Sequence, residues 1–468
     1  MSIETDHINF LIYRYLLESG FQHSSFTFGQ ESGIAHSAIA TTHIPPGSLI
    51  AQMQRALNYV QAEINLTEEG LPADPKFLED LPPLSLLESV QPSICEERRK
   101  ELWQKVQRAR TAEAETNDVV AKKNVEIPAS QLRELAGHST GAFMCQWNPK
   151  YNMLASCGSD NKARIYLDDP KMPPIVCLHP AEEGMGEVFS IDWSADGDHL
   201  CTGYADGYVR VWSSHDGELQ QRLAGTGHPT ARAKFSSNGR YIAAGDGGGN
   251  VMIWNTRTEK KLLGASFHEG SILSLTWIAE DKFVTAGTDS MICMFGVKKP
   301  YFQQRFSGHT DDVNMVDWND SLKMLASGSD DKTVRLWTLE SENVKHVIQH
   351  ESPVKFLAWC RAEASSHLLV TGADDGTVRI VDGRRGVCLH ALKAHASGIL
   401  CAEFSPDGRW LATSDGGCRV IVWDVERQDV VKTLLSKGAV FCVSWNMDGT
   451  HLAFADGSGR VADIDMSS

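Results

Sequence analysis

The sequence predicts an all-β eight-bladed β-propeller preceded by a small all-α N-terminal domain, and three observations carry this prediction. Two alternating apolar runs form a unit that recurs eight times, with spacings of 41 to 46 residues between equivalent positions. Turn sequences such as "SPDG", "SADG" and "NMDG" separate the runs, as Asp-Gly does in hairpins. The opening stretch "HINFLIYRYLLESGF" instead repeats its apolar residues with a helical period.

This opening stretch predicts a helix that begins near Asp6, a suitable N-cap, and ends at Gly20, which suits the left-handed position after a helix. A second short helix follows. The first helix is apolar nearly all round, which predicts a partner for it, most simply a second copy of the chain. The alternative is that it packs on the propeller. The residues predicted for self-association are Ile8, Phe10, Leu11, Ile12, Tyr15, Leu16 and Phe21.

The next region predicts one long amphipathic helix over residues 44–70, because apolar residues recur with a helical period after a proline start. Residues 107–125 contain few large apolar groups and predict a linker. The predicted domains are residues 1–35 (first helical motif), 36–106 (further helices), 107–125 (linker) and 126–468 (propeller).

Each repeat ends in an aromatic or other apolar residue, and these residues set the register. They are Tyr166, Trp212, Trp254, Phe295, Trp337, Val381, Trp423 and Ile464. The last repeat stops soon after its third strand. We expect residues 126–135 to supply the missing fourth strand and to close the ring, which removes an exposed sheet edge.

The repeats resemble WD40 repeats, whose histidine belongs to a buried hydrogen-bond chain with Ser or Thr, Asp and Trp. The fifth repeat carries the whole set as His309, Ser327, Asp331 and Trp337. One histidine per repeat, spread around a ring, cannot converge on a metal. The second and eighth repeats lack this histidine, and we expect packing and neighbouring blades to hold them more than the polar chain does. The six equivalent histidines are His138, His228, His268, His309, His350 and His395.

The composition limits the classes of function. The net charge of −16, with no basic excess in either half, disfavours direct DNA binding. An acidic chain can favour basic partners such as histone tails, although solubility is the more common reason for such a charge. The longest apolar runs are too short to span a membrane. No catalytic or phosphate-binding motif and no metal-ligand spacing occurs, so we expect neither an enzyme nor a cofactor.

A propeller binds partners through its faces and central channel. The second residue of each innermost strand is a candidate for the channel rim, where phenylalanines suit a peptide with an apolar or aliphatic-cationic anchor. The alternative is that these side chains pack between blades. The candidates are Phe143, Phe189, Leu273, Asn314, Lys355, Leu400 and Phe441.

Residues 7–31 resemble the LisH dimerisation motif, with matches that include Asn9, Leu16 and Phe28. Together with "PPGSLI" and "ALNYVQAE" in the following helix and with the first repeat, this order of parts resembles the transducin-beta-like 1 family. The resemblance implies a nuclear subunit of corepressor complexes that contain a class I histone deacetylase. It also implies an N-terminal region that forms a tetramer and grips corepressor helices, for which Leu49, Met53, Leu57 and Val60 are the candidates. In that family residues 44–70 correspond to a region called F-box-like.

The leading hypothesis is therefore a non-enzymatic scaffold of a histone-deacetylase corepressor complex. It would tetramerise through its N-terminal helices and bind partner proteins or histone tails through the propeller. One alternative is a substrate receptor of a ubiquitin ligase, and a second is a cytoskeletal scaffold that combines LisH and WD40 parts.

Overall fold

The computed structural model divides the chain into two units, residues 1–122 and 123–468. Each is described here by itself. The described residues are 5–34, 37, 48–50, 53, 91, 94–96, 98–100, 126–169, 171–177, 186–298, 301–341 and 343–467.

The first unit begins with two helices, α1 (Thr5–Glu18) and α2 (Gln22–Glu31), which contact each other. Gly20 has a φ of +81° and ends α1 as predicted, and Phe21 N–H donates to Leu16 C=O at 2.9 Å. Asp6 was predicted as the N-cap, but it lies in the first turn of α1, where a carboxylate still favours the helix dipole.

Little of the region from residue 36 to 125 is among the described residues. Ser48–Ile50 and Met53 are helical there, at the start of the long helix predicted over residues 44–70. Leu57 and Val60 lie outside the described residues. The rest of that helix and the linker at 107–125 stay predictions.

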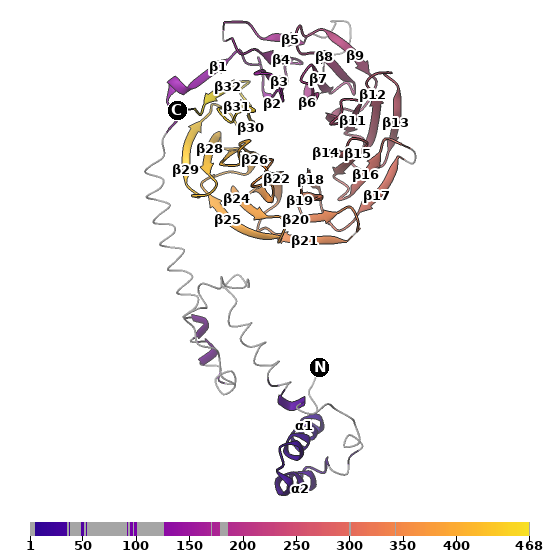
Figure 1. The fold of residues 1–468 in the computed structure, drawn as a ribbon, viewed down its shortest axis with the longest axis vertical. Coiled ribbons are helices and arrows are strands. Elements are labelled where there is room, and N and C mark those ends of the chain that lie inside the picture. The colour runs from indigo at the N-terminus through magenta and orange to yellow at the C-terminus, as the bar shows by residue number, and fades with distance from the viewer. Residues whose placement is uncertain are drawn as a thin grey trace. The chain divides into compact units, whose positions relative to one another are not determined.

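The second unit consists of eight four-stranded antiparallel sheets around a central opening, which confirms the eight-bladed propeller (Figure 1). We number the blades in chain order. Blades one to four contain β2 (Ala142–Trp147), β3 (Leu154–Gly158), β4 (Ala163–Tyr166), β5 (Ile175–Cys177); β6 (Val188–Trp193), β7 (His199–Tyr204), β8 (Val209–Ser213), β9 (Leu219–Leu223); β10 (Thr230–Phe235), β11 (Tyr241–Asp246), β12 (Asn250–Asn255), β13 (Lys261–Ser266); and β14 (Ile272–Ala279), β15 (Lys282–Gly287), β16 (Ile292–Gly296), β17 (Phe302–Phe306). Blades five to seven contain β18 (Val313–Asn319), β19 (Met324–Ser329), β20 (Thr333–Thr338), β21 (Val344–Gln349); β22 (Val354–Trp359), β23 (Leu368–Ala373), β24 (Thr377–Asp382), β25 (Val387–Lys393); and β26 (Ile399–Phe404), β27 (Trp410–Asp415), β28 (Arg419–Asp424), β29 (Val430–Leu435).

The eighth blade joins the two ends of the propeller. It contains β30 (Val440–Trp445), β31 (His451–Asp456), β32 (Val461–Asp465) and β1 (Leu132–Leu135), which follows the short 3-10 helix η3 (Ala129–Gln131). β1 pairs antiparallel with β32, with Leu132 opposite Ile464 and Leu135 opposite Val461. The structure therefore places a strand where the sequence predicted the closing one.

Hydrogen bonds link neighbouring blades at the ends of their innermost strands. A tryptophan Nε1–H donates to a main-chain carbonyl of the preceding blade at four of these seams. These bonds join Trp193 to Gln146 (3.0 Å), Trp277 to Lys234 (3.1 Å), Trp359 to Asp317 (3.2 Å) and Trp445 to Glu403 (3.1 Å).

One of these seams also contains an acid with an unusual pKa. The Glu403 carboxylate accepts a hydrogen bond from the main-chain N–H of Trp445 at 2.9 Å. Burial raises the pKa of Glu403 to about 8. The folded state therefore binds a proton that the unfolded state releases near pH 4.5, so stability falls as pH rises from about 4.5 to 8.

Glu403→Gln should remove this loss of stability, because glutamine keeps an acceptor for Trp445 N–H without a charge. Between pH 5 and 8 the wild type should lose up to about 1.4 kcal/mol per pH unit relative to the variant, and less where solvent screens the partly exposed carboxyl group. Melting curves of both proteins across this range measure the difference. Parallel curves would contradict the assignment.

The predicted polar chain is present in the fifth blade. His309 Nδ1 lies 2.8 Å from Asp331, its Nε2 lies 2.7 Å from Ser327, and Trp337 Nε1–H donates to Ser327 at 2.9 Å. The same Asp and Ser or Thr contacts occur at three further histidines, His138, His268 and His395. The His350 side chain lies 3.3 Å from the Thr371 hydroxyl, and no aspartate contact is present for it among the described residues.

His228 does not belong to this set, and its prediction was wrong. Its side chain is exposed, and Thr226 takes the place of a histidine by donating a hydrogen bond to Asp246. Thr226 stands 28 residues before Trp254, the same separation as His309 from Trp337. In the third blade the separation from the strand's tryptophan, rather than the Gly-His pair, identifies the residue that bonds the aspartate.

The second and eighth blades keep polar contacts although they lack the histidine. In the eighth blade Ser436 donates to Asp456 at 2.5 Å. In the second blade Trp212 Nε1–H donates to Thr202 at 2.8 Å, and fully buried Arg210 pairs with Asp206 at 2.6 Å. Other residue types thus satisfy the same buried groups.

Candidate functional site

The seven rim candidates, with Ala231 as the eighth position, share one backbone feature. Each is the second residue of an innermost strand, and each lies at a register shift where that strand bulges out of its ladder. The residue before each bulge is fully buried, whereas all eight bulged residues retain exposed surface. Their partial exposure is compatible with the predicted channel rim, and the rim position stays a prediction.

Three phenylalanines cluster on one side of this rim. Phe143 stacks on Phe189 with ring centroids 5.8 Å apart, and it meets Phe441 edge-on at 6.2 Å. They come from blades one, two and eight, and Phe441 is 39% exposed. We call Phe143, Phe189 and Phe441 the rim phenylalanines. Leu273 and Leu400, on blades four and seven, are partly exposed but are not in this cluster.

The two polar candidates come together on the fifth and sixth blades through a residue that the sequence analysis missed. Asn314 donates to Asp330 at 2.6 Å, and Lys355 Nζ lies 2.6 Å from the same carboxylate. Burial and the nearby Asp311 and Asp330 raise the pKa of Asp312. This part of the rim is therefore acidic, with Lys355 already neutralised.

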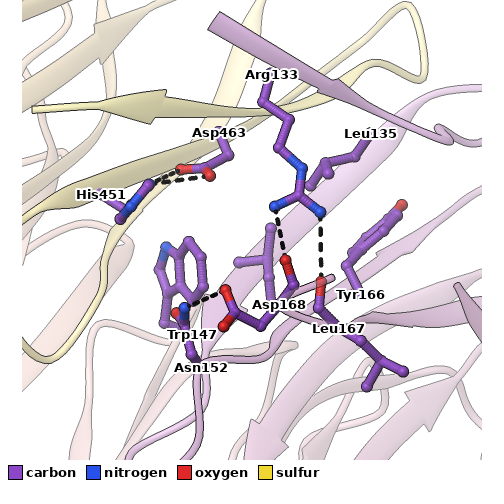
Figure 2. A pocket seen from close by; sticks show the side chains of 10 residues that line it. Arg133, Leu135, Trp147, Asn152, Tyr166, Leu167, Asp168, His451 and Asp463 are labelled. Carbon is purple, nitrogen blue, oxygen red and sulfur yellow. Dashed lines mark hydrogen bonds and ion pairs between the residues drawn. The ribbon is translucent and has the colours of Figure 1, made fainter. Parts of the chain in front are cut away.

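A small pocket lies at the closing seam, between the eighth and first blades (Figure 2). Arg133 of β1 donates to the Leu167 and Asp168 carbonyls, and His451 pairs with Asp463 at 3.1 Å. Trp147 lies beside them, and its buried Nε1–H has no hydrogen-bond partner among the described residues. The closing seam is therefore one of the seams without the indole bond that links four pairs of blades.

The residues predicted for self-association fall into two groups. Phe10 is 4% exposed, so its side chain is already covered within the protomer, contrary to its inclusion in the contact. Ile8 and Phe21 are 44% and 54% exposed, and the other four predicted residues are partly exposed. Leu17 and Phe26 also expose large apolar surfaces.

Of the residues predicted to grip a corepressor helix, Leu49 is partly exposed and Met53 is 39% exposed. Within the described part of the chain, no group of three or more His, Cys, Asp or Glu side chains is arranged to hold a metal ion. No helix in that part is both long and apolar enough to cross a membrane.

Comparisons with known proteins agree with this architecture. Residues 6–32 match the LisH model, residues 301–338, 341–382 and 386–424 match the WD domain, G-beta repeat, and residues 143–305 match the WDR19 first beta-propeller model. The chain is 32% identical to mouse F-box-like/WD repeat-containing protein TBL1X, over 88% of this chain and 89% of that protein. The chain belongs to the transducin-beta-like 1 family.

Other relatives support this membership. Human TBL1Y is 31% identical over 88% of this chain and 89% of its own length. The crystal structure of the C-terminal WD40 domain of Sif2 aligns with a TM-score of 0.65 and 22% identity, over 74% of this chain and 99% of that one. This second likeness bears on the fold alone. The resemblance inferred from the sequence is confirmed.

Proposed function

We propose that this member of the transducin-beta-like 1 family is a non-enzymatic nuclear scaffold of a histone-deacetylase corepressor complex. The N-terminal helices join several copies and grip corepressor helices, and the propeller rim binds peptides of partner proteins or histone tails. The observation that carries the proposal is the 32% identity over nearly the whole length of TBL1X, with the LisH match and the propeller in the same order.

Affinity purification of the full chain from an extract of its own cells, followed by mass spectrometry, tests the proposal. We expect to recover a class I deacetylase and a corepressor protein. The relatives' names carry the term F-box-like, which favours a ubiquitin-ligase adaptor as the second candidate. Recovery of cullin components without a deacetylase would support that candidate and contradict ours.

Replacement of all three rim phenylalanines by alanine should abolish peptide binding with little loss of stability, because each side chain is partly exposed. Loss of such anchors weakens binding by about 30-fold or more. The assay is binding of histone-tail and corepressor peptides to the full chain, with a melting curve of each variant. Phe302→Ala, which removes a partly exposed phenylalanine from the outer strand β17, is the control. Unchanged binding by the triple variant, or loss of its fold, would contradict the rim site.

A further inference from the structure

Arg232 is the one charged residue at the third position of the eight innermost strands. The residues at this position follow the rim residues directly, and we call them the inner ring. The inner ring consists of Met144, Ser190, Arg232, Ser274, Met315, Phe356, Cys401 and Cys442. Most of these side chains are apolar or sulfur-containing, so the guanidinium of Arg232 stands in a setting that does not favour a charge.

The side chain of Arg232 reaches well beyond its own blade. It starts from β10 in the third blade, yet its Nη1 lies 3.9 Å from the sulfur of Met144 in the first blade. Its other hydrogen bond is to the Ala231 carbonyl, at 3.4 Å. The residue retains some exposed surface, while burial lowers its pKa. The guanidinium is therefore only partly accessible to solvent.

No carboxylate among the described residues pairs with Arg232. Other buried arginines of the propeller are neutralised in this way, since Arg164 lies 2.8 Å from Asp160 and Arg210 lies 2.6 Å from Asp206. Arginine cannot lose its proton to escape the cost of burial. A guanidinium with no carboxylate beside it is therefore suited to an anion that comes from outside.

The guanidinium lies near residues that follow two of the rim phenylalanines in sequence. Met144, which it contacts, follows Phe143 directly. Cys442 follows Phe441, and hydrogen bonds with the Cys145 and Cys401 thiols, aided by the charge of Arg232, hold the pKa of Cys442 below its ordinary value. Arg232 is thus near the residues beneath two of the three rim phenylalanines. An apolar rim and a cation beneath it form a single amphipathic site.

We propose that Arg232 and the rim phenylalanines bind a peptide carboxylate that is carried next to an apolar side chain. The apolar side chain contacts the phenyl rings, and the carboxylate pairs with the guanidinium. The inference deepens the proposed peptide role of the rim and rests on it. It places the cationic groups of a basic tail elsewhere, at the acidic part of the rim around Asp312 and Asp330, because Arg232 repels them.

Three fluorescently labelled hexapeptides test the inference with the full chain. All end in phenylalanine: one has a free C-terminal carboxylate, one has a C-terminal amide, and one has the amide with glutamate as its penultimate residue. Wild-type protein should bind at least one carboxylate peptide about tenfold or more tightly than the uncharged amide. The comparison of the two carboxylate peptides distinguishes a chain terminus from an acidic side chain as the source of the anion.

Arg232→Met should abolish this preference and leave the amide peptide bound as before. Arg257→Gln, which removes an exposed cation from the same blade, should retain the preference. Equal binding of all three peptides by the wild type would overturn the inference and leave the rim site standing. Binding of none would contradict both. The wild-type comparison decides the question even if an Arg232 variant fails to fold.

Discussion

Deletion of residues 126–135 should open the propeller and lower its melting temperature by roughly 10 °C or more. The deletion removes β1, and with it the four-residue ladder to β32 and the Ile127 N–H bond to Thr433 C=O at 3.0 Å. It also uncovers the apolar surface that Ile127, Leu132 and Leu135 help to bury. Burial of such side chains contributes about 1.5–3 kcal/mol each, and every kcal/mol changes the melting temperature of a large domain by about 2–4 °C.

β1 forms the outer edge of the last blade by pairing with β32. Without it, β32 becomes an unpaired edge that can associate with another chain.

Calorimetry and size-exclusion chromatography of the deleted chain measure both effects. Deletion of residues 111–120, which precede β1 and leave it intact, is the matched control and should melt as the wild type does. An unchanged melting transition after deletion of residues 126–135 would contradict a closing role for β1.

The repeat was sufficient to predict the fold from sequence, because each blade buries its own apolar alternation and needs only its neighbours. The repeat also predicted the buried hydrogen-bond chain at His309, whose four residues stand at fixed separations in the sequence. The prediction failed at His228, because a Gly-His pair there is displaced by two residues and Thr226 provides the hydroxyl instead. At this blade the separation from Trp254 would have been a better guide than the Gly-His pair.

The candidate site was predicted only in outline. The sequence aligned Phe143, Phe189 and Phe441, but it could not show that a bulge takes each of them out of its ladder. Arg232 was missed entirely. It became informative only after ring closure brought its guanidinium to Met144, 88 residues away in the chain. Such contacts depend on the closed ring, and a local sequence pattern cannot predict them.

The second large effect concerns self-association through α1. Leu11→Asp or Tyr15→Asp should convert the assembly to monomers, because both side chains are partly exposed on a helix whose neighbours Ile8 and Leu17 are exposed and apolar. A carboxylate at an apolar contact loses its hydration without gaining a partner, which costs several kcal/mol. In a symmetric pair the cost arises twice, so association should weaken by at least about 100-fold.

Sedimentation velocity measures the change, and the propeller should melt as before because it is a separate unit. Gln22→Asp places the same charge at an exposed polar position in the first turn of α2 and should leave the assembly intact. Persistent oligomers of the Leu11 and Tyr15 variants would assign self-association to residues outside α1. If monomers form, recovery of partner proteins in the affinity purification should fall with them, because several linked copies bind a weak partner more tightly than one copy does.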